Sequence, residues 1–269
     1  MGTYHYLSGL PRSGNTVLSA ILNQHPDIHS SALSPVCEYM WVLHNSFNVQ
    51  ENTRRNIDKS GSLSIFSNLL ENHYAAIDKP IVFDREKNWG SPANLGMLKY
   101  YVTPTPKIIY TVRPIVEILA SFITLYAKSE FMEKEMASKG WDYKHYLTLD
   151  DNRCDFLMRP WGGIETELLF VNELKKPENK DVFHIIEYDD LINKPQEVMN
   201  DVYNFVGIES FSHNFTNIIK VEKDYEKLIG MPETTHKIRP ILKKTSPKPE
   251  SILSDYVISK YSNMEFWRK

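Results

Sequence analysis

This sequence has little cysteine, no long apolar run and no net positive charge, and each of these excludes a class of protein. The 269 residues include 2 cysteines, Cys37 and Cys154, too few for the disulfide framework of a small secreted domain. No stretch approaches the roughly 18 apolar residues of a membrane-spanning helix, and the first residues lack a signal-peptide pattern. A net charge of -3 provides no overall basic field for a nucleic acid. We therefore expect a cytoplasmic protein that binds neither nucleic acid nor a membrane.

Hydrophobic residues are abundant, by contrast, and their spacing predicts an α/β fold. They make up 42% of the chain, enough for a sizeable core. Short strand-like runs alternate with helical patterns, which favours a parallel sheet between helices. The expected strands are residues 3–9, 80–84, 107–112 and 182–188, and the expected helices are residues 15–25, 115–128, 163–176 and 195–207. In such sheets ligands bind at the carboxyl ends of the strands.

Three stretches fall outside this alternation, at residues 35–75, 129–160 and 225–269. We expect a single domain, 1–269, in which the first two are helical insertions that form a lid or an acceptor site, while the third is a closing segment. Trp141, Tyr143 and Tyr146 would suit stacking on an aromatic or a sugar ring. A surface excursion with a few packed aromatic residues is the alternative.

The loop "GLPRSGNT", residues 9–16, joins the first expected strand to the first expected helix. Its glycines, Gly9 and Gly14, and its threonine, Thr16, have the spacing of the phosphate-binding motif G-x-x-x-x-G-K-[ST]. Unpaired N–H groups and the positive end of the helix dipole make such a helix start an anion site. The motif's lysine is missing, however, because Asn15 stands in its place.

The positive charge of this loop is instead on Arg12, three residues before Asn15. Its planar guanidinium suits a tetrahedral oxyanion, and the hydroxyls of Ser13 and Thr16 can donate to the same group. A glycine turn with a surface arginine is the alternative reading. A second arginine, Arg113, follows the third expected strand, and Ser121 comes eight residues later on a helix. Two separate anion sites predict a ligand with phosphate at both ends.

These residues resemble the sulfotransferases that use 3'-phosphoadenosine 5'-phosphosulfate (PAPS). The first motif of that family, a strand, a [PR]-[KR]-S-G-[TSN]-T loop and a helix, is matched by residues 11–16. The second, an arginine followed by a serine eight residues later, is matched by Arg113 and Ser121, and the resemblance implies that these two bind the 3'-phosphate. It implies that the 5'-phosphosulfate is bound by Arg12, Ser13, Gly14, Asn15 and Thr16.

Two further segments resemble the same family. "LSAILNQHPDI", residues 18–28, looks like the tyrosylprotein branch, and residues 185–208 look like a widespread Y-E-D-L segment whose tyrosine, here Tyr188, lies near the adenine. The resemblance implies a P-loop-like three-layer α/β sandwich with a central parallel sheet. It also implies transfer of a sulfuryl group that leaves adenosine 3',5'-bisphosphate (PAP). Neither a lysine for a γ-phosphate nor a metal ion is then required.

The segment "FDREKNWGSP", residues 83–92, looks like a D-K-x-R-x-W element of bacterial family members. The resemblance implies that Arg85 and Lys87 face the sulfuryl group, beside Arg12, and that Trp89 lines the adenine or acceptor pocket. A solvated charged turn with one packed tryptophan is the alternative.

The general base and the closing segment are less well marked. Where the tyrosylprotein branch has an acidic pair, this chain has Ala32 and Leu33, so Glu38 becomes the first choice for the base. The alternative for Glu38 is a residue favoured in the first turn of a helix. The resemblance implies that Lys237 and Arg239 belong to a basic loop that closes over the 3'-phosphate, and a plain solvated basic run is the alternative.

The predicted function is sulfuryl transfer from PAPS to a small acceptor, a phenolic or carbohydrate hydroxyl, without a metal. A P-loop nucleotide kinase is the first alternative, and Asp84 is the one residue that could then hold magnesium. A noncatalytic nucleotide-binding module is the second. The sequence carries no signal for an oligomeric state.

Overall fold

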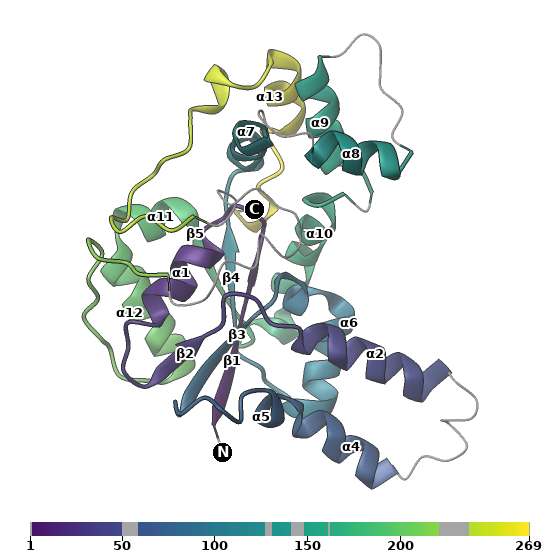
Figure 1. The fold of residues 1–269 in the computed structure, drawn as a ribbon, viewed down its shortest axis with the longest axis vertical. Coiled ribbons are helices and arrows are strands. Elements are labelled where there is room, and N and C mark those ends of the chain that lie inside the picture. The colour runs from purple at the N-terminus through teal and green to yellow at the C-terminus, as the bar shows by residue number, and fades with distance from the viewer. Residues whose placement is uncertain are drawn as a thin grey trace.

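A computed structural model of the chain describes residues 2–49, 59–126, 131–140, 148–160, 162–220 and 237–268. Its centre is a five-stranded, wholly parallel sheet with the strand order β2-β3-β1-β4-β5 (Figure 1). The strands are β1 (Thr3–Gly9), β2 (Ile28–Ser30), β3 (Ile81–Arg85), β4 (Ile108–Val112) and β5 (Phe183–Glu187). The expected strands at 3–9, 80–84, 107–112 and 182–188 are thereby confirmed, and β2 was not predicted.

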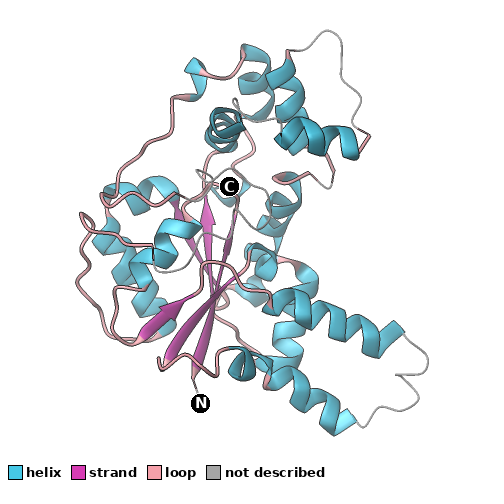
Figure 2. Cartoon of the chain, viewed as in Figure 1, coloured by secondary structure: helices cyan, strands magenta, loops and turns pink. Residues whose placement is uncertain are grey.

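The sheet is covered by helices on both faces, so the α/β three-layer architecture is confirmed (Figure 2). Alternate residues of β1 point to opposite sides: Tyr6 belongs to one buried cluster and Leu7 to the other. One face carries α1 (Asn15–Leu22), α11 (Tyr188–Asn193) and α12 (Pro195–Val206), and the other carries α6 (Pro92–Met97), α7 (Ile115–Tyr126) and α10 (Glu165–Leu174).

The stretches at 35–75 and 129–160 contain helices in the part that the structure describes. The first holds α2 (Val36–Val49), α4 (Lys59–Ser67) and α5 (Leu69–His73), and the second holds α8 (Phe131–Ser138) and α9 (Leu149–Leu157). The closing stretch holds η4 (Pro249–Ser251), α13 (Asp255–Tyr261) and η5 (Phe266–Arg268). Short turns of helix complete the chain: η1 (Lys87–Gly90), the π-helical η2 (Leu98–Val102) and η3 (Pro177–Asn179).

Helix α13 is attached to α9 through buried carboxylates. Asp155 accepts hydrogen bonds from Tyr261 at 2.7 Å, Tyr256 at 3.0 Å and Lys260 at 2.9 Å. Burial would raise the pKa of Asp155, but these hydrogen bonds outweigh it and lower the pKa. The closing stretch is therefore fixed to the body of the domain at this end.

Cys37 and Cys154 are buried and unpaired. Within the described ranges, none of the helices combines the length and the apolar character that crossing a membrane requires.

Candidate active site

The loop of residues 9–16, called the phosphate loop below, leaves β1 at the carboxyl edge of the sheet. Packing fixes its first glycine. Gly9 has φ 144°, and a Cβ there would lie 2.4 Å from the backbone oxygen of Thr111 in β4. Only glycine allows so close an approach. The next amide, of Leu10, donates to the same oxygen of Thr111 at 2.9 Å. The loop therefore begins from a position that β4 holds in place.

Arg12 lies at the tip of this loop, in contact with both parts of the second motif. Its backbone is left-handed, with φ 59°, which is uncommon for a residue with a Cβ. Its Nε donates to Ser121 Oγ at 3.2 Å, and its carbonyl accepts from Arg113 at 3.0 Å. The structure thus brings together Arg12, Arg113 and Ser121, which are about a hundred residues apart in the chain.

Tyr188 closes the other side of the loop. Gly14 precedes α1 with φ 99°, and a Cβ there would lie 3.0 Å from the Tyr188 ring. The guanidinium of Arg113 lies over the same ring, 4.4 Å from its centroid. The ring is therefore in contact with both the phosphate loop and the second arginine.

Two of the predicted loop ligands turn away from the loop's open side. The hydroxyl of Ser13 is buried and donates to the Leu10 carbonyl, and it also contacts Thr111. The amide of Asn15 donates to the same Leu10 carbonyl at 3.3 Å. The prediction that the Ser13 hydroxyl donates to a phosphate oxygen does not fit this geometry, because the hydroxyl already donates its hydrogen bond to the Leu10 carbonyl of the same loop. The backbone N–H groups of Ser13 and Asn15 and the half-buried Thr16 remain as candidate ligands.

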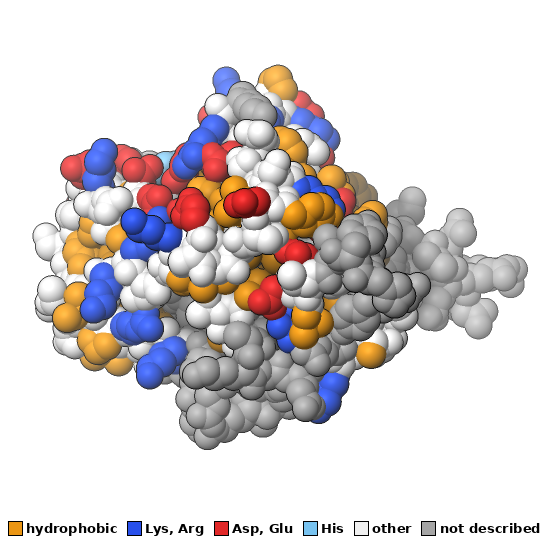
Figure 3. Space-filling model, turned by 90° about the horizontal axis from the view of Figure 1, so that it is seen from above, with side chains coloured by type: hydrophobic (Ala, Val, Ile, Leu, Met, Phe, Trp, Pro, Cys, Tyr) orange, Lys and Arg blue, Asp and Glu red, His pale blue; other side chains and the backbone are white. Residues whose placement is uncertain are grey.

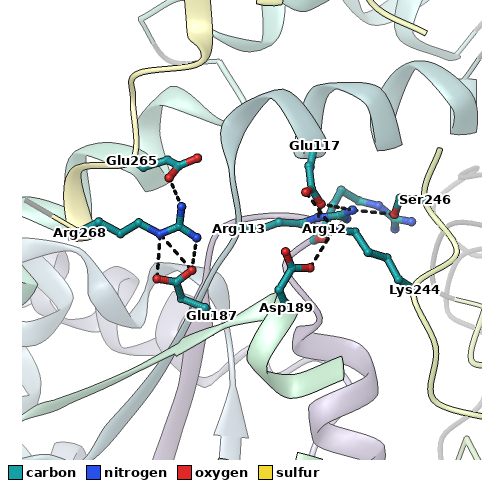
Figure 4. A network of polar contacts seen from close by, with 9 residues as sticks. All are labelled: Arg12, Arg113, Glu117, Glu187, Asp189, Lys244, Ser246, Glu265 and Arg268. Carbon is teal, nitrogen blue, oxygen red and sulfur yellow. Dashed lines mark hydrogen bonds and ion pairs between the residues drawn. The ribbon is translucent and has the colours of Figure 1, made fainter. Parts of the chain in front are cut away.

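Arg113 is the centre of a polar network that the sequence did not reveal (Figure 4). Its Nε and Nη2 donate to one Glu117 oxygen at 3.1 Å and 3.0 Å, and Nη2 also donates to Ser246 at 2.6 Å. Lys244 donates to the other Glu117 oxygen at 2.9 Å and to Asp189 at 2.8 Å. The carboxylate of Glu117 is thus shared by two cations.

The closing segment reaches the site through residues other than those predicted. Lys237 and Arg239 are exposed, whereas Lys244 and Ser246 make the contacts with the Arg113 network. Partial burial lowers the pKa of Lys244, but its carboxylate partners outweigh this and raise it, so the side chain stays charged. One signal for Glu117 was available, because it lies only four residues after Arg113, in the first turn of the helix that follows.

The carboxyl end of β3 carries the second pair of predicted cations. Arg85 is buried, and its backbone N–H donates to Ser31 Oγ at 2.9 Å. Lys87 follows on η1 and donates to Glu167 on α10 at 2.6 Å. Because β3 lies directly beside β1, with Arg85 opposite Leu7, both residues lie at the edge from which the phosphate loop leaves.

Asp84 and Trp89 form a structural centre rather than part of a pocket. Asp84 is fully buried and accepts from Ser34, Tyr74 and Trp89 Nε1. Burial raises the pKa of Asp84 despite these three donors. Trp89 is also fully buried, so the expectation that it lines an adenine or acceptor pocket is wrong. Asp84 is likewise enclosed by its donors and is not positioned as an open magnesium ligand.

The candidate base and the aromatic stretch remain predictions. Glu38 lies exposed in the first turn of α2, where an acidic side chain also favours the helix dipole. Trp141, Tyr143 and Tyr146 lie outside the described residues.

The surface of the molecule seen from above shows basic and acidic side chains interspersed (Figure 3). Positive charge on this surface is therefore local rather than general.

Comparison with known proteins establishes the family. A profile described as "Sulfotransferase family" matches residues 6–213 of the chain. The chain belongs to the sulfotransferase family. The match includes the phosphate loop, Arg113, Ser121 and Tyr188, and it ends before the segment that carries Lys244. No curated protein matches this sulfotransferase.

Solved structures share the fold of this sulfotransferase at low identity. The sulfotransferase domain of the Synechococcus PCC 7002 olefin synthase is 17% identical with a TM-score of 0.56, covering 100% of this chain and 95% of that one. The sulfotransferase domain from the curacin biosynthetic pathway is 17% identical with a TM-score of 0.51, covering 98% and 91%. A sulfotransferase from Alicyclobacillus acidocaldarius is 15% identical with a TM-score of 0.52, covering 85% and 90%.

Proposed function

We propose that this sulfotransferase takes a sulfuryl group from PAPS and transfers it to the hydroxyl of a small acceptor, phenolic or carbohydrate. The observation that carries the proposal is the meeting of Arg12, Arg113 and Ser121 at the carboxyl edge of the sheet. Two arginines on adjoining elements suit a nucleotide with phosphate groups at both ends. The buried ring of Tyr188 contacts both Gly14 and Arg113 and so links the two ends of this site.

The residues around Arg113 fit a 3'-phosphate. The carboxylate of Glu117 already accepts from Arg113 and Lys244, so this position is one where two cations hold one anion. Ser246 and Ser121 add hydroxyls to the same region. A bound 3'-phosphate would replace Glu117 in part of these contacts. Arg113 and Lys244 would then be direct ligands of the phosphate.

Catalysis in this scheme is positioning and charge stabilisation. When bound, PAPS supplies an activated sulfuryl group, and negative charge develops on the phosphate oxygen that leaves. Arg12 and the N–H groups of residues 14–16 would stabilise that oxygen, and Arg85 and Lys87 would neutralise the sulfuryl oxygens. Removing one such preorganised donor costs on the order of a hundredfold in rate.

The acceptor hydroxyl must lose its proton, and Glu38 stays our first choice as the base. A phenolic acceptor, with a pKa near 10, needs less help from a base than a sugar hydroxyl. This favours phenols as the first class to test.

Among the residues that the structure describes, the site lacks the lysine and the accessible magnesium ligand that a kinase would need. The motif's lysine is replaced by Asn15, whose amide is engaged with the loop carbonyl, and Asp84 is enclosed by three hydrogen-bond donors. A noncatalytic nucleotide-binding module is the other rival, and it differs from our proposal in turnover.

The test is transfer of [35S]sulfate from labelled PAPS to a panel of phenols and sugars, with and without a metal chelator. We expect transfer that the chelator leaves unchanged and that falls about a hundredfold in Arg12→Ala, provided that urea denaturation shows the variant folded. Transfer that requires magnesium and a nucleoside triphosphate would support the kinase. Tight PAPS binding without transfer to any member of the panel would support the noncatalytic module.

A further inference from the structure

The ion pair between Lys87 and Glu167 joins an exposed cation to a buried anion. Lys87 Nζ lies 2.6 Å from Glu167 Oε1, and the two side chains are 56% and 1% exposed. Lys87 is on η1, directly after β3, and Glu167 faces it from α10, eighty residues further along the chain. The pair thus spans two elements at the carboxyl edge of the sheet.

Stability does not account for this pair. Removing a carboxylate from water is costly, and a solvent-exposed lysine returns little of that cost. Within the described part of the chain, Oε2 of Glu167 has no hydrogen-bond partner at all. Burial accordingly raises the pKa of Glu167, although the nearby Lys87 opposes the shift. A buried carboxylate held at such cost is more readily explained by function than by folding.

Both members of the pair are fixed to the central strands. Ser8 Oγ in β1 donates to the Lys87 carbonyl and accepts from the Gly90 amide at 3.3 Å. On the other side, the hydroxyl of Tyr110 in β4 donates to the Glu167 carbonyl at 2.8 Å. Ser8 is four residues before Arg12, so the pair is tied to the strand that carries the phosphate loop.

We propose that Glu167 is a positioning residue that holds the Lys87 ammonium at the sulfuryl end of the donor. The inference rests on the proposed function, since Lys87 is placed there only if PAPS occupies the loop. An ammonium has three N–H groups, so it can donate to a carboxylate and to a sulfuryl oxygen at the same time. Fixing a long, rotamer-rich lysine before the donor arrives removes part of the ordering cost that binding would otherwise carry.

The experiment compares the affinities for PAPS and PAP, because the two nucleotides differ by the sulfuryl group. Calorimetric titrations use wild type, Lys87→Met and Glu167→Gln. Glu173→Gln is the matched control, because Glu173 lies on the same helix and pairs with Lys176 at the same 2.6 Å distance. Urea denaturation of each variant gives its stability.

We expect Lys87→Met and Glu167→Gln to weaken PAPS binding by about tenfold and by several-fold, respectively, with PAP binding unchanged. Glu167→Gln should be at least as stable as wild type, since a buried charge is removed. Glu173→Gln should alter neither affinity.

A Glu167→Gln variant that binds PAPS as wild type does, or that loses PAPS and PAP equally, overturns the inference while leaving the proposed function in place. A loss of stability without a change in the ratio of the two affinities would make Glu167 a structural residue and overturn it as well. Wild-type protein that binds neither nucleotide would instead overturn the proposed function, and this inference with it.

Discussion

Replacing Gly14 by alanine tests how the phosphate loop and Tyr188 depend on each other. The backbone at Gly14 has φ 99°, a conformation in which a side chain costs about 1–2 kcal/mol. The new Cβ would also lie 3.0 Å from the Tyr188 ring and 3.4 Å from Leu191. Moving a packed ring by a few tenths of an ångström adds about 1–2 kcal/mol. We therefore expect Gly14→Ala to lower the free energy of unfolding by about 2–4 kcal/mol.

Urea denaturation measures this loss, and Gly207→Ala is the control. Gly207 also has a positive φ, 78°, but a Cβ there would meet none of the described residues within 4 Å. Its substitution should cost only the backbone strain, about 1 kcal/mol. PAP affinity should fall about tenfold in Gly14→Ala and stay unchanged in Gly207→Ala. Equal losses of stability, together with unaltered affinity for PAP, would refute the packing of Tyr188 against the loop.

Three further predictions concern the closing segment, the sheet and the α9–α13 contact. Lys244→Ala should lower the affinity for PAP about tenfold in calorimetric titrations and leave the affinity for AMP unchanged. Substitution of the exposed neighbour, Lys243→Ala, should change neither affinity, and equal effects of the two substitutions would contradict this prediction. Burial, aided by the charge of Lys107, lowers the pKa of His5 to about 4 from 6.5. Since the folded pKa is the lower one, stability is full above pH 6.5 and falls by up to about 3 kcal/mol as the pH approaches 4; urea melts of His5→Phe should lose this part of the pH dependence. Asp155→Asn should cost about 2–3 kcal/mol in urea denaturation, because its hydrogen bonds from α13 lose their charge, and a loss below about 0.5 kcal/mol would contradict that contact.

The sequence predicts the strands well where burial on both faces makes them continuously apolar. Strand β4, which reads IIYTV and is buried at every position, follows this pattern. Strand β2 escaped prediction because three residues, Ile28–Ser30, are too short to show a period. Arg12 and Arg113 could be predicted to lie near one another, because both follow strands whose carboxyl ends meet at one edge of a parallel sheet.

The remaining site residues depend on orientations that no short pattern encodes. Ser13 turns inward because Thr111, 98 residues away, lies beneath it. Lys244 rather than Lys237 reaches Glu117, although the two lysines belong to the same basic run. Glu167 pairs with Lys87, which lies eighty residues earlier in the chain. Such pairings follow from tertiary packing, and only the assembled fold reveals them.

Calorimetric titration of wild type and Arg113→Ala with PAP, and with ATP plus magnesium as the rival ligand, tests the central claim most directly. Urea denaturation first establishes that the variant is folded. Our account predicts that wild type prefers PAP and that the substitution lowers the affinity for PAP at least a hundredfold, since a buried arginine held by Glu117 and Ser246 is lost. A preference for magnesium-ATP, or PAP binding that a folded Arg113→Ala variant retains in full, would contradict the two-phosphate site.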